Sequence, residues 1–240
     1  MQIKTKTIIL RVVKYGESQL IIDALTESHG RLSFIQRVPK TSRSRVPKQL
    51  FRPMAVLQVA FDYRQRQRLQ RITDAQMAFP MSSLLFDARK FTVAMFLAEF
   101  TCLCTRAEQQ DSALFAFVEN SVRWLDLCER DFANFHIIYM VHLARFVGFA
   151  PDLTGGEGDY FDLRAGCFVS VVPTHRDWLM PDDGRRLRLL LRLRYGSMHV
   201  LRLSHDERNR MIDAIVQFYR LHLPDFPEPR SLAVLREVFA

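Results

Sequence analysis

The sequence lacks the long hydrophobic segments that would place it in a membrane. No window approaches the roughly 20 uncharged apolar residues that a membrane-spanning helix needs. The N-terminus also lacks the apolar stretch and the small-residue cleavage site of a signal peptide, because it runs directly into an alternating strand pattern. We therefore expect a cytoplasmic protein with no membrane partner.

Cysteines are few, and their spacing disfavours both metal sites and disulfides. The four are Cys102, Cys104, Cys128 and Cys167, and no C-x-x-C pair is present. Structural zinc sites draw on closely spaced pairs of Cys or His. We interpret all four as plain thiols that pack in or near cores, and we expect no metal or other cofactor.

Recognisable catalytic motifs are missing as well. The seven histidines occur singly, without a Cys or carboxylate at a known ligand spacing. The glycine-rich segment 155–158 is not a phosphate loop, because no G-K-[ST] follows it. Three Pro-Asp pairs could begin a nuclease motif of the PD…(D/E)-x-K type, but no lysine follows Lys90. The sequence therefore predicts a protein without catalytic residues.

Acidic residues are scarce in the first third of the chain, although the chain as a whole is ordinary in charge content. Its 240 residues carry a formal net charge of +8. Residues 1–80 contain 15 Lys and Arg against 5 Asp and Glu, whereas residues 81–240 contain 19 against 21. An excess of positive charge confined to one module points to a polyanionic partner for that module.

The strongest basic signal is the segment 37–48, which has no acidic residue among its Lys and Arg side chains. Its prolines and small polar residues disfavour a helix, and flexible Lys and Arg side chains suit phosphate groups. The alternative is a solvated loop kept basic for solubility, but no acidic residues offset these charges locally. The predicted nucleic-acid-binding residues are Arg37, Lys40, Arg43, Arg45, Lys48, Arg52, Arg64, Arg66, Arg68 and Arg71.

Turn residues divide the first 80 residues into five expected strands. The apolar and β-branched runs cover residues 6–14, 20–26, 31–38, 51–63 and 69–79. Five short strands predict a small closed or nearly closed barrel, with a sandwich as the structural rival. Exposed rings could stack on bases, but most aromatic residues of this segment are better interpreted as core. They are Tyr15, Phe34, Phe51, Phe61 and Tyr63.

From about residue 82 the apolar period becomes helical. Apolar residues recur every three or four positions, and their Phe- and Met-rich faces are better interpreted as core than as a peptide groove. The expected helices cover about 91–102, 112–125, 134–148, 183–195, 204–223 and 230–239. Asn134 is an expected N-cap, and Ser204 begins an S-x-x-E capping box. Residues 152–173 break the pattern and predict a small hairpin.

Several short motifs occur along the chain in a characteristic order. They are Leu10-Arg11, Tyr15-Gly16-Glu17-Ser18, Leu25-Thr26, Gly30-Arg31, Leu50-Phe51-Arg52-Pro53, Phe146-Val147-Gly148-Phe149-x-Pro151, Phe161-Asp162-Leu163-x-x-Gly166-Cys167-Phe168 and Arg230-Ser231-Leu232-x-Val234-Leu235-Arg236. No single motif is decisive. Together, their order and spacing resemble the bacterial DNA repair protein RecO family over essentially the whole chain.

The resemblance implies an α+β fold with two domains. An N-terminal OB-fold β-barrel would span residues 1–80, and an all-α domain with a small knuckle-like hairpin at about 152–173 would span residues 81–240. Some family members bind zinc there through four cysteines, but only Cys167 remains in this chain. The zinc is therefore expected to be lost, with apolar packing by Phe161, Phe168 and Val171 in its place.

The resemblance also implies a function without enzymatic turnover. Family members bind single- and double-stranded DNA, anneal complementary strands and, with RecR, help RecA replace single-strand-binding protein. DNA contacts would fall on the basic residues named above, and the C-terminal tail of single-strand-binding protein would bind the helical domain. The rival interpretation is a basic OB-fold adaptor that binds RNA or an acidic protein partner.

Overall fold

The computed structural model describes residues 2–37, 46–105, 109–153 and 158–239. By its internal contacts the chain divides into two compact units, Met1–Leu127 and Cys128–Ala240. Strands give way to helices between residues 77 and 88, well before the division between the units. The expected domain boundary at residues 80 and 81 stays a prediction. Within the described ranges, no helix has the length and apolar character needed to cross a membrane.

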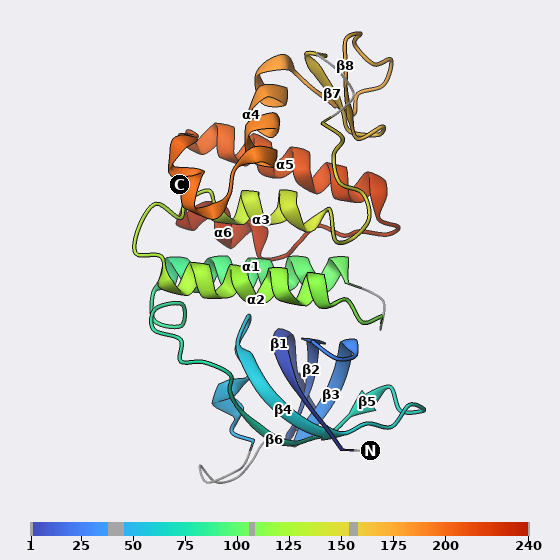
Figure 1. The fold of residues 1–240 in the computed structure, drawn as a ribbon, viewed down its shortest axis with the longest axis vertical. Coiled ribbons are helices and arrows are strands. Elements are labelled where there is room, and N and C mark those ends of the chain that lie inside the picture. The colour runs from blue at the N-terminus through green and yellow to red at the C-terminus, as the bar shows by residue number, and fades with distance from the viewer. Residues whose placement is uncertain (1, 38–45, 106–108, 154–157, 240) are drawn as a thin grey trace. The chain divides into compact units, whose positions relative to one another are not determined.

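The first unit begins with strands and ends with two helices (Figure 1). Its elements are β1 (Gln2–Tyr15), β2 (Gln19–Thr26), β3 (Gly30–Arg37), the 3-10 helix η1 (Lys48–Leu50), β4 (Val56–Asp62), β5 (Leu69–Gln70), β6 (Ile72–Met77), α1 (Ala88–Cys104) and α2 (Ser112–Leu127). The fourth expected strand therefore begins at Val56 rather than at residue 51. Met54, with φ 60°, lies in a turn in which the Ala55 amide donates to the Arg52 carbonyl.

The strands close into a barrel because one segment forms both edges of the sheet. The strand order is β5-β3-β2-β1-β4-β6. β5 pairs in parallel with β3, whereas β6 pairs antiparallel with β4, and only Arg71 separates β5 from β6. Segment 69–77 thus joins the two edges, as in the five-stranded barrel of an OB-fold. The barrel prediction is confirmed, and the sandwich alternative is wrong.

The interior of the barrel is filled by side chains that alternate along its strands. Phe34 and Phe61 are fully buried and meet edge to face, with their ring centroids 5.2 Å apart. A register shift between Ile9 and Arg11 bends β1, so that its first half pairs with β4 and its second half with β2. Burial of each such aromatic side chain contributes roughly 1.5–3 kcal/mol to stability. Interdigitated apolar side chains therefore give the barrel surface a fixed frame.

A buried polar cluster fixes the segment that leads from the barrel into α1. The Asp126 carboxylate accepts hydrogen bonds from the backbone amides of Ser82, Ser83 and Leu84 at 2.7–2.9 Å. Lys90 Nζ donates to Ser83 Oγ and to the Asp126 carbonyl. Burial by itself raises the pKa of the Asp126 carboxyl, but these backbone hydrogen bonds hold the pKa below its ordinary value. The cluster therefore anchors α1 and α2 to the chain entering them.

The second unit is mostly helical, with a small sheet inserted between its helices (Figure 1). Its elements are α3 (Phe135–Leu143), β7 (Tyr160–Asp162), β8 (Cys167–Val169), β9 (Trp178–Leu179), α4 (Pro181–Arg192), the 3-10 helix η2 (Tyr195–Val200), α5 (His205–His222) and α6 (Leu232–Val238). The predicted helix 134–148 thus ends at residue 143, and hydrogen-bonded turns follow it. The hairpin prediction is confirmed, but the third strand, β9, was not predicted.

The two predicted helix caps have different outcomes. The capping box before α5 is confirmed, because Ser204 and Glu207 each accept a hydrogen bond from the backbone amide of the other. Asn134 occupies the position before α3, but its side chain makes no capping hydrogen bond. Instead, its amide donates to the Leu201 carbonyl and accepts from Arg208. The predicted N-cap position is therefore confirmed, but the side chain does not cap the helix because tertiary partners compete for it.

Two of the three apolar residues expected to hold the hairpin do so. Phe161 and Phe168 are buried and pack at 5.0 Å between ring centroids. Val171 is 78% exposed, so its expected contribution is wrong. The reason is local, since β8 ends at Val169 and Val171 lies beyond the paired strand.

Candidate nucleic-acid interface

The predicted DNA-binding residues fall into two groups. Lys40, Arg43 and Arg45 lie outside the described residues. The other seven belong to the barrel, and all of them are exposed: Arg37, Lys48, Arg52, Arg64, Arg66, Arg68 and Arg71. Their role in binding stays a prediction.

The turn between β4 and β5 presents three of these arginines on a fixed backbone. The buried Gln70 side chain donates from Nε2 to the carbonyls of Arg64 and Gln67, and its Oε1 accepts from the Arg64 amide at 2.9 Å. These bonds pin the backbone of the turn, while the side chains of Arg66 and Arg68 stay exposed. The sequence analysis missed Gln70, although a polar residue at a buried strand position could have signalled it.

A groove of about 610 Å³ lies on the barrel, where the pairing of β3 with β5 leaves part of the sheet edge open. β5 ends at Gln70, whereas β3 continues to Arg37 and loses its neighbour on that side. The side chains lining the groove are Ile35, Gln36, Val46, Asp62, Arg64, Gln67, Leu69, Arg71, Ile72 and Thr73. Two predicted residues, Arg64 and Arg71, are thus brought together there, with one acidic neighbour, Asp62.

The structure does not bring all the predicted residues into this groove. Arg37 lies at the end of β3, one residue beyond the lining residue Gln36. Lys48 lies in η1 and Arg52 just after it, on the segment that enters β4. Arg64 and Arg71 therefore form the groove part of the candidate interface, and the other five described residues, Arg66 and Arg68 among them, lie outside the groove lining.

None of these seven cations forms an ion pair with a carboxylate of the described residues. Other cations of the first unit do have such partners. Lys6 pairs with Glu119 on α2 at 3.1 Å, and Arg31 lies 3.7 Å from Asp23 while donating to two carbonyls at the end of α1. Positive charge without a nearby carboxylate raises the local potential and attracts polyanions. The candidate interface therefore carries positive charge that no ion pair within the described residues compensates.

The Glu119 carboxylate shows the opposite arrangement. It accepts hydrogen bonds from Lys6 and from Arg123, whose guanidinium also lies 3.9 Å from the centre of the Phe79 ring. Burial by itself raises the pKa of the Glu119 carboxyl, but these two partners hold the pKa below its ordinary value. Lys6 is therefore structural and is not part of the candidate interface.

One histidine of the second unit lies entirely within its core. His136 is fully buried beside Phe239, with ring centroids 5.6 Å apart. Burial, assisted by Arg208, lowers the pKa of His136 to about 3. A histidine that stays neutral throughout the physiological range is poorly suited to general acid–base chemistry.

The hairpin does not fit a zinc ion. Cys167 pairs with Asp162 across the hairpin, and the Asp162 carboxylate accepts the backbone amides of Arg164 and Ala165 and approaches His175 Nε2 at 3.2 Å. Zinc in such knuckles is held by several thiolates or imidazoles. No group of three or more Cys, His, Asp or Glu in the part of the chain that the structure describes could hold a metal ion. Hydrogen bonds and apolar packing hold the hairpin instead.

Comparison with known proteins covers nearly the whole chain. The family model described as "Recombination protein O N terminal" matches residues 1–81, and the one described as "Recombination protein O C terminal" matches residues 85–232. The chain is 41% identical over 238 residues to the DNA repair protein RecO of Phocaeicola vulgatus, covering 99% of each protein. It is 41% identical to that of Bacteroides fragilis over 98% of each, and 30% identical to that of Flavobacterium johnsoniae over 100% of each.

Proposed function

The chain belongs to the RecO family of DNA repair proteins, and from this premise we propose that it binds DNA through its barrel as a non-enzymatic recombination mediator. A role in DNA repair follows from the family. The proposal adds that the protein binds single- and double-stranded DNA, anneals complementary strands and, with RecR, helps RecA replace single-strand-binding protein. It also places this activity in the cytoplasm.

One observation supports the proposed DNA contact above all others. Seven exposed cations lie on the barrel without an ion-pair partner among the described carboxylates, and two of them line its groove. Phosphate groups are the natural complement of such a surface, because arginine forks bind phosphate oxygens in pairs. The turn pinned by Gln70 holds three of the arginines in place without using their side chains.

The mechanism requires no covalent chemistry. Each Lys or Arg that neutralises a phosphate releases condensed counterions, so binding is driven largely by ion release. Two strands held on one positive surface repel each other less than they do in solution. Strand annealing therefore accelerates on the barrel, and high salt suppresses both binding and annealing.

A competition titration with the full chain separates this proposal from its rivals. A labelled single-stranded DNA oligonucleotide is bound, and unlabelled DNA, RNA of the same sequence and polyglutamate are added as competitors. The proposal predicts that DNA competes at least as well as RNA and that polyglutamate competes poorly. A clear preference for RNA favours an RNA-binding module, and preferential displacement by polyglutamate favours an adaptor for acidic proteins.

The proposed mediator role has its own test. RecA filament formation is followed on single strands coated with single-strand-binding protein, with this protein and RecR added separately and together. The proposal predicts rapid filament formation only with both proteins, and binding of the tail of single-strand-binding protein to the helical region. No acceleration by the pair, despite normal DNA binding, would contradict the mediator role but not the DNA contact.

The non-enzymatic part of the proposal is tested by incubation with labelled DNA and divalent metal ions. The proposal predicts that the DNA remains intact at equimolar protein over hours. Multiple turnovers of cleavage that copurify with the protein would overturn it.

A further inference from the structure

The outer surface of β1, β2 and β3 carries apolar side chains in register at the end of the barrel away from α1. Val13 pairs with Ile21 on β2, and Ile21 pairs with Ile35 on β3. Ile21 and Ile35 are half-buried, and Val13 is 39% exposed. Their strand neighbours Leu20 and Phe34 are buried in the barrel core. Since side chains alternate along strands, the row of three faces outward.

The next row along the same surface contains an exposed ring. Tyr15 pairs with Gln19, and Gln19 pairs with Arg37. Tyr15 is 56% exposed, whereas Phe34, Phe51 and Phe61 are buried in the barrel core. Tyr63 is half-buried and packs against His29 and Phe61, so Tyr15 is the most exposed of these aromatic rings in the described chain.

The backbone holds this ring at a defined place. Tyr15 ends β1, and a tight connection of residues 16–18 leads into β2, with Gly16 at φ 61°. Glycine adopts this left-handed conformation without strain. The ring therefore sits at the rim of a short hairpin instead of on a long loop, and little conformational freedom is lost when a ligand binds.

α1 covers the other half of this outer surface. Arg31 on β3 donates to the carbonyls of Cys102 and Thr105 at the end of α1, and its pairing partner Leu25 is buried. The rows containing Val13 and Tyr15 remain open. The exposed part of the surface is thus limited to the end that carries the apolar row and the ring.

The charge and position of this surface favour a nucleic-acid strand as its occupant. Arg11 on β1 and Arg37 on β3 are exposed and form no ion pair with a described carboxylate. Ile35 belongs both to the apolar row and to the lining of the groove that contains Arg64 and Arg71. A strand whose phosphates follow the groove arginines would bring its bases to the ring.

We propose that Tyr15 stacks on an unpaired base of single-stranded DNA, with Val13, Ile21 and Ile35 beside it and Arg37 at the adjoining phosphate. This inference rests on the proposed function and deepens it. Stacking needs an exposed base face, which a duplex offers only at its ends. The surface therefore distinguishes single-stranded from double-stranded DNA, a distinction that phosphate contacts alone do not make.

The test compares Tyr15→Ala, Tyr15→Phe and Tyr15→Leu in the full chain, with Phe86→Ala as a matched control. Phe86 is 79% exposed and lies outside the barrel strands. We expect Tyr15→Ala to weaken single-strand binding by roughly 5- to 100-fold, without changing its salt slope or duplex affinity. Tyr15→Phe keeps affinity within about twofold, Tyr15→Leu loses less than Tyr15→Ala, and Phe86→Ala has no effect.

The outcomes are separable. Equal losses of affinity for single strands and duplexes in Tyr15→Ala would overturn the stacking role. It would also be overturned if Tyr15→Ala bound single strands as tightly as a wild-type protein that itself shows a steep salt slope. The proposed function would survive both results. A wild-type protein that binds no DNA would instead remove the proposed function itself. Circular dichroism of each variant shows whether its fold is retained.

Discussion

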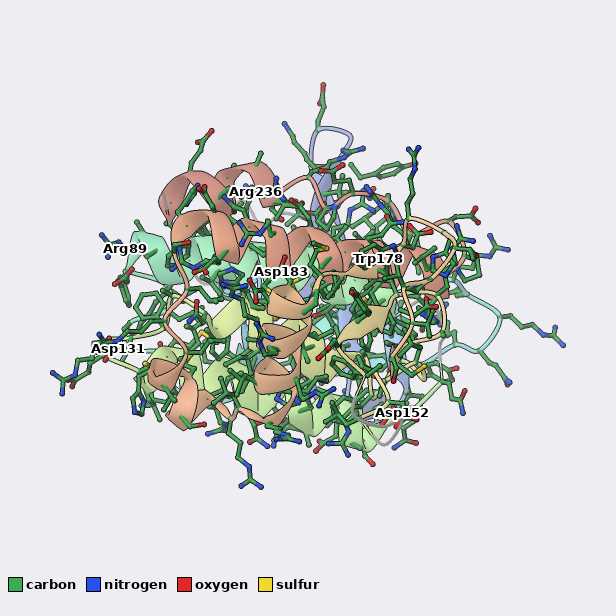
Figure 2. The ribbon with its side chains drawn as sticks, turned by 90° about the horizontal axis from the view of Figure 1, so that it is seen from above. Arg89, Asp131, Asp152, Trp178, Asp183 and Arg236 are labelled. Carbon is green, nitrogen blue, oxygen red and sulfur yellow. The ribbon has the colours of Figure 1, made fainter. Side chains whose placement is uncertain are left out.

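Both parts of the molecule use arginine heavily, but the barrel and the C-terminal unit treat its charge differently. Residues 128–240 contain 15 Arg and 15 Asp or Glu, and among the described residues of this range six arginines form ion pairs with carboxylates. Asp183 on α4, for example, which is labelled in Figure 2, pairs with both Arg186 and Arg210. In the barrel, the seven exposed cations of the candidate interface have no such partner among the described residues.

The difference shows that the number of basic residues says less about where a polyanion can bind than whether those residues form ion pairs. Exposed ion pairs contribute about 0–1 kcal/mol each, so pairing in the C-terminal unit mainly cancels charge. The barrel leaves the charge of the seven candidate residues without an ion-pair partner among the described residues, and two of them line a groove. The proposed DNA contact therefore lies on the barrel, whereas the paired arginines of the second unit are expected to be structural.

The largest expected effect comes from removing four barrel arginines together. The variant Arg64→Ala, Arg66→Ala, Arg68→Ala and Arg71→Ala should bind single-stranded DNA roughly 100- to 1000-fold more weakly at 0.1 M salt, because several phosphate contacts and their released ions are lost. Fluorescence anisotropy with a labelled oligonucleotide measures this change.

The matched control removes the same charge from the other unit. Its substitutions are Arg164→Ala, Arg185→Ala, Arg210→Ala and Arg220→Ala, at exposed positions that form ion pairs. Its affinity should stay within a few-fold of the wild type. Comparable losses in the two variants would break the contrast between the units.

Core substitutions should separate the units by stability. Phe34→Ala in the barrel and Phe161→Ala in the small sheet each remove a fully buried ring, at a cost of about 3–5 kcal/mol. Hydrogen exchange followed by mass spectrometry should show the loss of protection mainly in the unit that carries the change. Only Phe34→Ala should weaken DNA binding, and an equal loss with Phe161→Ala would argue for a site beyond the barrel.

The buried carboxylate of the first unit offers a pH test. Because hydrogen bonds lower the pKa of Asp126 in the folded state, its contribution to stability is present above about pH 4 and is lost as the pH falls through the folded-state pKa. Asp126→Asn should cost about 1–3 kcal/mol near neutral pH and lose this acid dependence. Urea unfolding at several pH values measures both, with the exposed Asp74→Asn as control. An unchanged acid dependence in Asp126→Asn would contradict the assignment.

The smallest expected effect concerns the Gln70 clamp. Gln70→Leu removes the hydrogen bonds that pin the turn, so its arginines must be ordered on binding at a cost of about 0.5–1.5 kcal/mol. Affinity should fall about three- to tenfold while the salt slope is retained, because no charge is removed. The control Gln76→Ala, at an exposed position of β6, should leave the DNA affinity unchanged. A flattened slope in Gln70→Leu would mean that Gln70 acts on the fold and not on the turn.

Features encoded locally could be predicted from the sequence. Strand runs and turn residues indicated the barrel, the S-x-x-E pattern indicated the capping box of α5, and the scarcity of acids indicated the charged module. Each depends on neighbours along the chain, as in Ser204 and Glu207. The order of family motifs added the OB-fold, which local pattern alone left as an unspecified barrel.

Features set by distant partners could not be predicted in this way. Asn134 is drawn from its capping role by Leu201 and Arg208, which lie about 70 residues away in the chain. The break between β5 and β6 at Arg71 arises because the segment 69–77 pairs with two different strands, β3 and β4. Likewise, nothing in the sequence distinguishes Arg64 from Arg31, since only the fold brings the Asp23 carboxylate within ion-pair distance of Arg31.

The salt dependence of single-strand binding tests the central claim most directly. The logarithm of the binding constant is measured against the logarithm of salt concentration for the wild type, the four-arginine barrel variant and the matched C-terminal variant. We predict a steep wild-type line, with roughly a 300-fold loss between 50 and 200 mM if about six phosphates are contacted. The barrel variant should be shallower by a slope of about 3, and the C-terminal variant should parallel the wild type. Parallel lines for the wild type and the barrel variant would contradict the account.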